Sequence, residues 1–125
     1  MEYIKGFMVK AKSHKFGKVT VKHTLEGYYK LLGCELIDIV TRKIGGKYYD
    51  IIIDDEGLFK DEPVVTGLQE DGSPLVGSLL VVGLPDSEGE STDLTDSDIE
   101  AISKSVKYAY NFDGFYQPVL VGLGY

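Results

Sequence analysis

The residues best suited to chemistry are three consecutive acids, Asp54, Asp55 and Glu56, which follow an apolar run. Carboxylates at a strand end bind a divalent cation when their oxygens converge on one point. Neighbouring strand residues point to opposite faces of a sheet, so Asp54 and Asp55 would need a turn to meet. The pattern therefore favours a turn with solvated acids. Together with Asp50 upstream, these three acids form a candidate interaction surface: Asp50, Asp54, Asp55 and Glu56.

The other reactive side chains are scattered along the chain. His14 and His23 lie nine residues apart, which is not a spacing typical of zinc ligands. Cys34 follows a predicted helix end, whereas a reactive thiolate prefers a helix N-terminus or a cationic neighbour, so we expect it to pack in the core. The acidic segment 86–100 does not fit a calcium loop, and no segment fits a phosphate-binding loop. The sequence thus predicts no catalytic residue, metal or cofactor, and an enzyme is the least favoured class.

The charge of the chain changes sign near its middle. The net charge is −7 at pH 7, but residues 1–47 hold ten Lys or Arg against four acids, and residues 48–125 hold three lysines against sixteen acids. In the folded protein, the charges of the two halves either offset each other or leave a bipolar surface that steers partners. The early lysines alternate with Phe7 and Phe16, as on some nucleic-acid-binding surfaces. Because the protein is acidic and has no arginine before Arg42, we interpret these lysines as a solubilising face and do not expect nucleic acid as a partner.

Length and composition bound the class of protein. The 125 residues fit one domain, 1–125, which is long enough to bury a core without disulfides. Fifteen glycines and nine tyrosines, with no tryptophan, indicate a turn-rich sheet protein. The single cysteine cannot form an intramolecular disulfide, which favours the cytoplasm. No run approaches the roughly 20 apolar residues of a membrane span and no signal-peptide block is present, so we expect a soluble protein. Monomer and homodimer both stay open.

Periodicity predicts three elements before residue 35. Residues 3–11 alternate and predict a strand, and the sequence Lys-Val-Thr-Val-Lys at 18–22 alternates like a half-buried edge strand. Residues 24–32 predict a two-turn helix, with Thr24 as its N-cap and Gly33 just past its end. A glycine inside this helix lowers its propensity, so we expect packing to hold it in place.

A hairpin is the firmest architectural prediction. Residues 35–44 and 47–54 are β-prone runs joined by Gly45-Gly46, and glycine tolerates the positive φ that two-residue hairpin turns require. If Ile44 faces Lys47, apolar residues lie on both sides of the paired strands. This predicts that the hairpin forms the centre of the sheet.

The middle of the chain alternates between turn formers and one apolar run. Residues 61–74 predict a loop, because Pro63 and the cluster from Asp71 to Pro74 are typical of turns. The glycine-bounded segment 77–83 predicts a buried strand. The acidic, serine-rich residues that follow predict another loop rather than a second domain.

The last quarter predicts a helix and a strand. Thr95 is suited to an N-cap with acids in the first turn, and the spacing of Ile99, Ile102 and Val106 predicts a helix over 95–110. After a turn, residues 116–125 predict the last strand.

The order of these motifs resembles a bacterial family called domain of unknown function thirty-eight forty-six. The shared features are the helix that ends at Leu32-Gly33, the turn from Asp54 to Gly57 after a strand pair, and the strand at 77–83. The resemblance covers most of residues 3–110. It implies genes carried on plasmids, phages and conjugative elements, and it implies no known activity and no catalytic residue.

These observations predict an α+β fold in which a mostly antiparallel sheet surrounds a central hairpin, about 35–54, with helices at 24–32 and 95–110 packed on it. As function we expect a small non-enzymatic factor of a mobile element that binds a protein, of unknown identity, through its acidic surface. Two alternatives stay open. One is an anti-defence protein that mimics nucleic acid with its acids, and the other is a weak nucleic-acid binder that uses the N-terminal lysines.

Overall fold

The computed structural model describes residues 2–57, 63–111 and 113–125 of the chain. Strands and helices are both present among them, which confirms the α+β class. The strands are β1 (Tyr3–Val9), β2 (Phe16–Lys22), β3 (Ile37–Ile44), β4 (Lys47–Asp54), β5 (Val65–Gln69), β6 (Pro74–Val76), β7 (Leu79–Val82), β8 (Val106–Tyr110) and β9 (Tyr116–Leu123), and the helices are α1 (Leu25–Leu32) and α2 (Asp96–Ser103).

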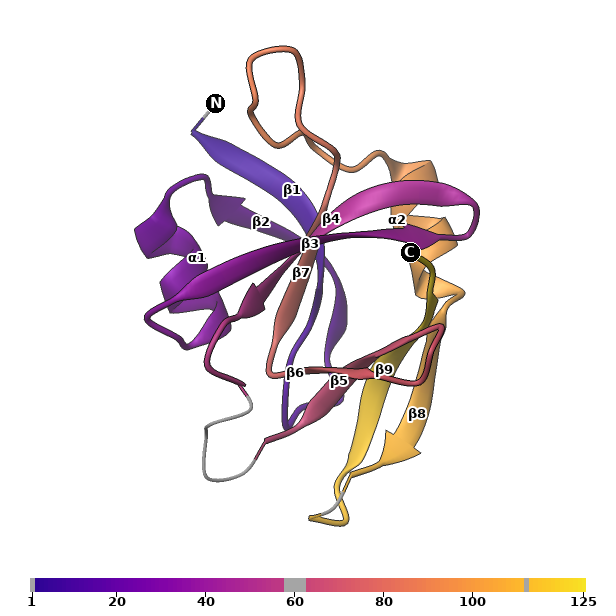
Figure 1. Cartoon of the computed structure of the whole chain (residues 1–125). Coiled ribbons are helices and arrows are strands. Elements are labelled where there is room, and N and C mark those ends of the chain that lie inside the picture. The colour runs from indigo at the N-terminus through magenta and orange to yellow at the C-terminus, as the bar shows by residue number, and fades with distance from the viewer. Residues whose placement is uncertain (1, 58–62, 112) are drawn as a thin grey trace.

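The strands form two sheets (Figure 1). The five-stranded sheet has the order β2-β1-β7-β4-β3 and is antiparallel throughout. The four-stranded sheet has the order β6-β5-β9-β8, in which β5 and β9 run parallel and the other neighbours run antiparallel. Most of the pairing is therefore antiparallel, as predicted, but it is divided between two sheets.

The hydrophobic core lies on both faces of the five-stranded sheet. Strand β7 shows why, because its four residues are all buried and alternate between the faces. Leu79 and Val81 join a cluster that includes Leu120 of the second sheet, while Leu80 and Val82 join a cluster under α1. The predicted buried strand within residues 77–83 is thus confirmed, and it holds the two layers of the protein together.

Helix α1 forms where the sequence predicts it. Thr24 caps its first turn by accepting a hydrogen bond from the Gly27 amide at 3.0 Å, and Gly33 ends it in the left-handed conformation with φ 65°. Gly27 is required by packing, since a Cβ at this position would lie 2.3 Å from the Lys22 carbonyl oxygen. The low helix propensity of glycine is thus offset by a close approach of α1 to the end of β2.

The hairpin of β3 and β4 has the two-glycine turn that the sequence suggests, with φ 60° at Gly45 and 88° at Gly46, and Ile44 pairs with Lys47. The prediction that it forms the centre of the sheet is wrong. Strand β3 is an edge strand, and Ile39 on it is 49% exposed. The centre is β7, which is apolar on both faces and pairs with both β1 and β4.

The predicted helix over 95–110 is too long. Helix α2 spans Asp96–Ser103 with Lys104 as its C-cap, and Val106–Tyr110 forms strand β8 instead. Residues 106–110 alternate valine and tyrosine with smaller or charged residues, and they pair with β9 across a turn that begins at Asn111. Strand pairing therefore overrides the helical spacing of the apolar residues. No helix in the described residues is long and apolar enough to cross a membrane.

The predicted loop over 61–74 is also wrong in part, and residues 61 and 62 lie outside the described residues. Val65–Gln69 forms β5, and Pro74–Val76 forms β6. The turn formers near Asp71 make the turn between these two strands, with the Asp71 carboxylate accepting from the Ser73 amide at 2.9 Å. The turn was evident from composition, but its flanking strands are too short for periodicity to reveal.

Candidate functional site

The four acids of the predicted interaction surface do not share one environment. Asp50 and Asp54 are 6% and 5% exposed, whereas Asp55 and Glu56 are exposed. Asp50 accepts a hydrogen bond from the Thr41 hydroxyl at 2.6 Å, and Asp54 accepts one from the Glu56 amide at 2.9 Å. Two of the four acids therefore support local structure from within. Among the described residues, no group of three His, Cys, Asp or Glu side chains is placed to hold a metal ion.

His23 is held between a tyrosine and an acid. Its Nδ1 atom is hydrogen-bonded to the Tyr28 hydroxyl, and its Nε2 atom lies 2.8 Å from a Glu90 carboxylate oxygen. Burial, with a smaller contribution from the Glu90 charge, raises the pKa of Tyr28 to about 12. Tyr28 therefore stays protonated at neutral pH and is a poor nucleophile. These contacts attach the loop that carries Glu90 to α1. Cys34 packs against the hydrophobic cluster that includes Tyr28.

Asp98 is the most strongly held acid. Its carboxylate accepts hydrogen bonds from Lys47 Nζ at 2.9 Å, from the Tyr49 hydroxyl at 2.8 Å and from the Thr95 amide at 2.9 Å. Burial opposes its charge, but the hydrogen bonds from Thr95, Lys47 and Tyr49 outweigh this, and they hold the pKa of Asp98 far below its usual range. Burial and the neighbouring Asp98 raise the pKa of Tyr49. This cluster joins α2 to β4.

The aromatic side chains gather in a different place. Six rings from three separate parts of the chain contact one another, and we call them the aromatic surface: His14, Phe16, Tyr108, Tyr110, Phe115 and Tyr116. Tyr116 is central, with its ring centroid 4.7 Å from that of Tyr110 and 5.2 Å from that of Tyr108. The Tyr108 ring in turn lies 6.2 Å from Phe16, which starts β2. The two sheets thus contribute rings to one continuous array.

A buried glutamine fastens the two halves of the aromatic surface together. Gln117 of β9 is fully buried, and its amide oxygen accepts from the Lys12 amide while its amide nitrogen donates to the Lys10 carbonyl, both at 2.8 Å. These residues form the connection between β1 and β2, in which Lys12 adopts φ 56°. The side chain satisfies backbone groups that have no strand partner. It therefore sets where His14 and Phe16 lie relative to β9.

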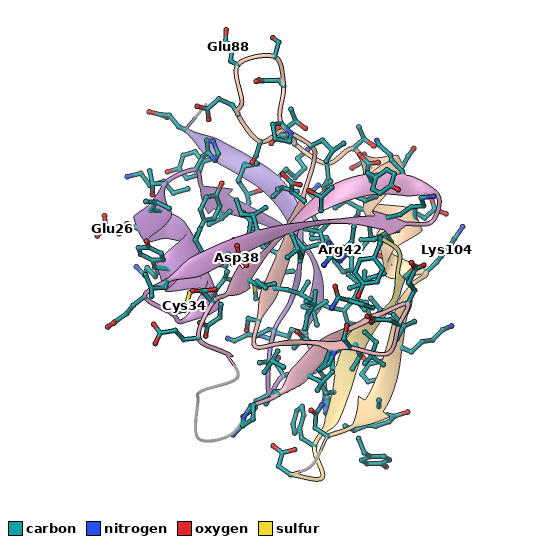
Figure 2. The ribbon with its side chains drawn as sticks, viewed as in Figure 1. Glu26, Cys34, Asp38, Arg42, Glu88 and Lys104 are labelled. Atoms are coloured by element: carbon teal, nitrogen blue, oxygen red, sulfur yellow. The ribbon has the colours of Figure 1, made fainter. Side chains whose placement is uncertain are left out.

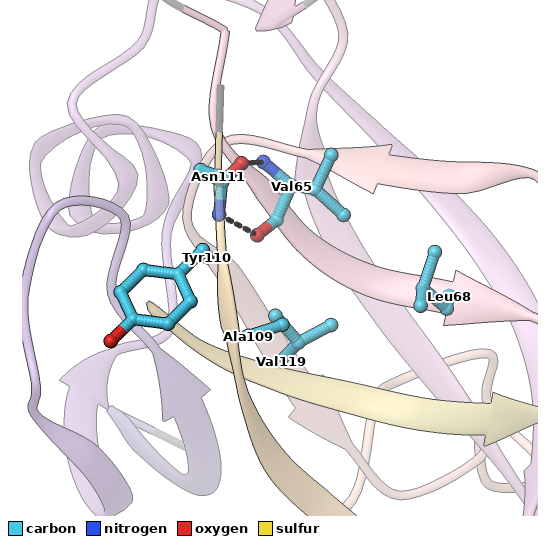
Figure 3. A pocket seen from close by; sticks show the side chains of 6 residues that line it. All are labelled: Val65, Leu68, Ala109, Tyr110, Asn111 and Val119. Atoms are coloured by element: carbon cyan, nitrogen blue, oxygen red, sulfur yellow. Dashed lines mark hydrogen bonds between the residues drawn. The ribbon is translucent and has the colours of Figure 1, made fainter. Parts of the chain in front are cut away.

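An asparagine fixes the hairpin of β8 and β9 in a similar way (Figure 3). Asn111 accepts from the Val65 amide at 2.8 Å and donates to the Val65 carbonyl at 3.3 Å. Beside this pair lies a cavity of about 290 Å³, lined mostly by apolar side chains that include Leu68, Ala109 and Val119. Tyr110 lines the cavity and also contacts Tyr116, so the cavity borders the aromatic surface.

The aromatic surface is exposed and lies among cations. Five of the six rings belong to exposed residues, from Phe16 at 37% to Tyr110 at 76% among those with the larger apolar rings, and Phe115 is half-buried. Exposed aromatic rings in groups are uncommon unless they bind something. Segments 10–18 and 105–117, which carry the six rings, hold five lysines and one acid. Lys15 and Lys18 line a cavity of about 190 Å³ together with Phe16. The chain is acidic overall, but it is locally positive here.

The opposite end of the molecule carries acids. The loop between β7 and α2 extends beyond the sheets with Glu88 at its outer end, away from the tip of the β8–β9 hairpin (Figures 1 and 2). It holds the acids Asp86, Glu88, Glu90 and Asp93. The change of sign along the sequence is thus matched by a separation in space between this loop and the aromatic surface.

The sequence pattern drew attention to one ring of the aromatic surface, as part of a lysine-rich face, and did not bring out the others as a group. Phe16 was considered together with Phe7, but Phe7 is fully buried in the core. His14 was considered only as a metal ligand, and its ring instead stacks on Phe115 at 5.0 Å. The tyrosines of β8 were assigned to a helix, which hides that Tyr108 and Tyr110 lie on one side of a strand. The alternation in that segment was the available signal.

Comparison with known proteins identifies a family. No curated protein and no solved structure matches the chain. A family model described as domain of unknown function (DUF3846) matches residues 4–107. This range contains His14 and Phe16 and ends just before Tyr108, so the tyrosines of the aromatic surface lie beyond it. The match covers most of the chain, and the protein therefore belongs to the DUF3846 family.

Proposed function

We propose that this protein is a non-enzymatic nucleic-acid-binding protein that uses the aromatic surface. The observation that carries the proposal is the convergence of six exposed or half-exposed rings from distant parts of the chain among lysines. Rings stack on bases and lysines neutralise phosphates, so the two kinds of side chain together match both components of a nucleic acid. Binding through the acids is less well supported, because Asp50 and Asp54 are buried.

The chemistry of the surface favours binding over catalysis. Tyrosine, phenylalanine and lysine side chains supply stacking and charge, and the one histidine, His14, is packed between Phe115 and Tyr108. The surface is open and lies on two sheets rather than in an enclosed pocket, as is common for proteins that track a flexible strand. A place on a mobile genetic element, which the family resemblance implies, is compatible with this role, as is the cytoplasm.

The net charge of −7 does not oppose such binding at short range. Salt screens charges over about 8 Å at physiological ionic strength, so a phosphate at Lys15 or Lys18 interacts mainly with its neighbours. The acids of the loop that carries Glu88 lie at the other end of the molecule. We therefore expect binding that is modest in affinity and strongly weakened by salt.

The test is a salt titration of binding by fluorescence anisotropy with a labelled oligonucleotide of about 20 nucleotides of mixed sequence. Each lysine that contacts a phosphate of a single strand contributes about 0.7 to the slope of log K against log salt. Lys15→Gln combined with Lys18→Gln should reduce the affinity and lower the slope by about 1.4. The matched control replaces two lysines outside the surface, Lys30 and Lys104, with glutamine and should behave like the wild type.

Two results would overturn the proposal. The first is the absence of binding by the wild type to single-stranded or duplex oligonucleotides at about 50 mM salt, a concentration at which nonspecific binders are tight. The second is an equal loss of affinity in both lysine pairs, which would show that only the total charge matters. Circular dichroism of each variant establishes that the fold is intact.

A further inference from the structure

We infer that the aromatic surface selects unpaired nucleotides, whose bases stack on the tyrosines of β8 and β9. This inference rests on the proposed function and specifies its ligand class. The base pairs of a duplex stack on each other and present only their edges in the grooves, so an exposed ring gains a stacking partner only from an unpaired base. Tyr110, the most exposed tyrosine of the surface, is placed to offer such a face.

The arrangement of the rings suits a short stretch of single strand. Tyr110 and Tyr116 face each other across the β8–β9 pair, and Tyr108 lies two residues from Tyr110 on the same side of β8. Aromatic side chains on neighbouring strands of a sheet commonly stack two or three bases of a single-stranded ligand. Tyr116 is already in contact with the rings of Tyr108 and Tyr110, so the outer faces of these two tyrosines provide for about two nucleotides.

The distribution of charge disfavours a duplex. Duplex DNA carries one negative charge per ~1.7 Å of its length, and it is too stiff to curve around a small protein at low cost. The lysines form one local group beside Phe16, and most of the remaining charge of the molecule is negative. A flexible single strand needs few cations and can leave the surface before it meets the acids.

The two side-chain amides beside the described rings are already engaged and are not available to read bases. Asn111 is the nearest amide to Tyr110, and both ends of its side chain are hydrogen-bonded to the backbone of Val65. Gln117 is likewise engaged with the connection between β1 and β2. Stacking on rings tolerates every base, so we expect little dependence on sequence.

The experiment compares three labelled ligands of one sequence on the full chain: single-stranded DNA, single-stranded RNA and the blunt DNA duplex. Wild type should bind a single strand at least about tenfold more tightly than the duplex. Tyr110→Ala should weaken single-strand binding by about 5- to 150-fold, the range measured for loss of one stacked base, and leave duplex binding unchanged. The two single-stranded arms decide between DNA and RNA as the source of the bases.

Two controls make the comparison specific. Tyr110→Phe keeps the ring and should bind like the wild type, and Tyr3→Ala removes an exposed tyrosine of β1 outside the aromatic surface and should have no effect. The chain has no tryptophan, so Tyr110→Trp introduces a unique fluorophore, and base stacking should quench its emission. Tyr110 is 76% exposed, so none of these changes threatens the core.

The experiment distinguishes a failure of this inference from a failure of the proposed function. Equal binding of single strand and duplex, unchanged in Tyr110→Ala, would overturn this inference and leave the proposed function standing. Failure to bind any of the three ligands would overturn both. Self-association that Tyr110→Ala abolishes, without nucleic-acid binding, would identify the surface as an interface between copies of the chain and would also overturn both.

Discussion

Asp98 is the residue on which the junction between α2 and the β3–β4 hairpin depends. It caps its own helix through Thr95 and also accepts from Lys47 and Tyr49, so one carboxylate satisfies donors from two elements. A carboxylate accepts hydrogen bonds on both of its oxygens, whereas a neutral amide of the same shape has one acceptor oxygen and a donor in place of the other. The junction therefore requires an ionised acid at this position.

Replacing Asp98 with asparagine should lower the free energy of unfolding by about 2 kcal/mol at pH 7, because the cap and two further bonds are weakened. The lowered pKa of Asp98 means that its contribution is complete above the unfolded pKa of about 3.9 and is lost as pH falls toward the folded pKa. The difference between wild type and variant should therefore shrink by about 1 kcal/mol between pH 7 and pH 3. Urea denaturation at both pH values measures it.

Asp96 provides the matched control for this prediction. It is an exposed acid in the first turn of the same helix, so Asp96→Asn should cost only about 0.5 kcal/mol through the helix dipole. A difference between Asp98→Asn and wild type that stays constant from pH 7 to pH 3 would contradict the assigned role of the ionised carboxylate.

At the scale of elements, the aromatic surface depends on two chain segments that side-chain hydrogen bonds, rather than strand pairing, hold against β9 and β5. Gln117 holds the connection between β1 and β2, and Asn111 holds the end of β8. Each amide mimics a backbone peptide and so extends the sheet where the strands have ended. The position of the rings is therefore set by amides outside the ring array.

Replacing Gln117 with leucine, which is similar in size, should release the connection between β1 and β2. The variant removes the hydrogen bonds that Gln117 makes to the Lys12 amide and the Lys10 carbonyl, at a cost of about 1–3 kcal/mol. Hydrogen exchange at the Lys12 amide should accelerate, and single-strand binding should weaken because Phe16 separates from Tyr108. Ser13→Ala, which removes only a bond within the connection, is the control. Unchanged exchange in Gln117→Leu would refute this account.

Sequence was a good guide to those elements whose signals are local. Helix α1 has a cap at each end, and β7 is a short apolar run between glycines, so neighbouring residues alone determine them. Strand β8 was mistaken for helix because Ile99, Ile102 and Val106 have helical spacing, and only pairing with β9 decides against it. The same holds for the site, since Phe16 and Tyr108 are 92 positions apart and meet only through the packing of two sheets.

The whole molecule is electrically polarised, with lysines near the aromatic surface and acids in the loop that carries Glu88. The sequence showed the change of charge along the chain, left open whether the two halves offset each other, and placed the candidate interaction surface on the acids around the end of β4. Burial is the reason for the difference, because Asp50 and Asp54 point into the protein while the tyrosines of β8 point out of it. Charge can be counted from sequence, but exposure depends on which face of a strand is covered.

The uneven distribution of charge predicts how acids that do not contact the ligand affect single-strand affinity. Changing Asp55, Glu56 and Glu88 to their amides reduces the net charge from −7 to −4 without touching the aromatic surface, and all three side chains are exposed. Charges far from the ligand act through the long-range field, so single-strand affinity should rise by about twofold at low ionic strength. The increase should vanish near 0.15 M salt, where screening acts over about 8 Å. Anisotropy at about 10 mM and 150 mM salt measures both values.

The same variant separates contact with the ligand from long-range steering. If the acids served as the binding surface, their removal would abolish an interaction instead of strengthening one. Lys15→Gln with Lys18→Gln changes the charge by a similar amount in the opposite sense and acts at contact distance, so its effect should persist at 150 mM salt. An effect of the acid substitutions that also persists at that salt concentration would mean that Asp55, Glu56 or Glu88 lies at the ligand. The assignment of contact to the lysines and of steering to these acids would then be wrong.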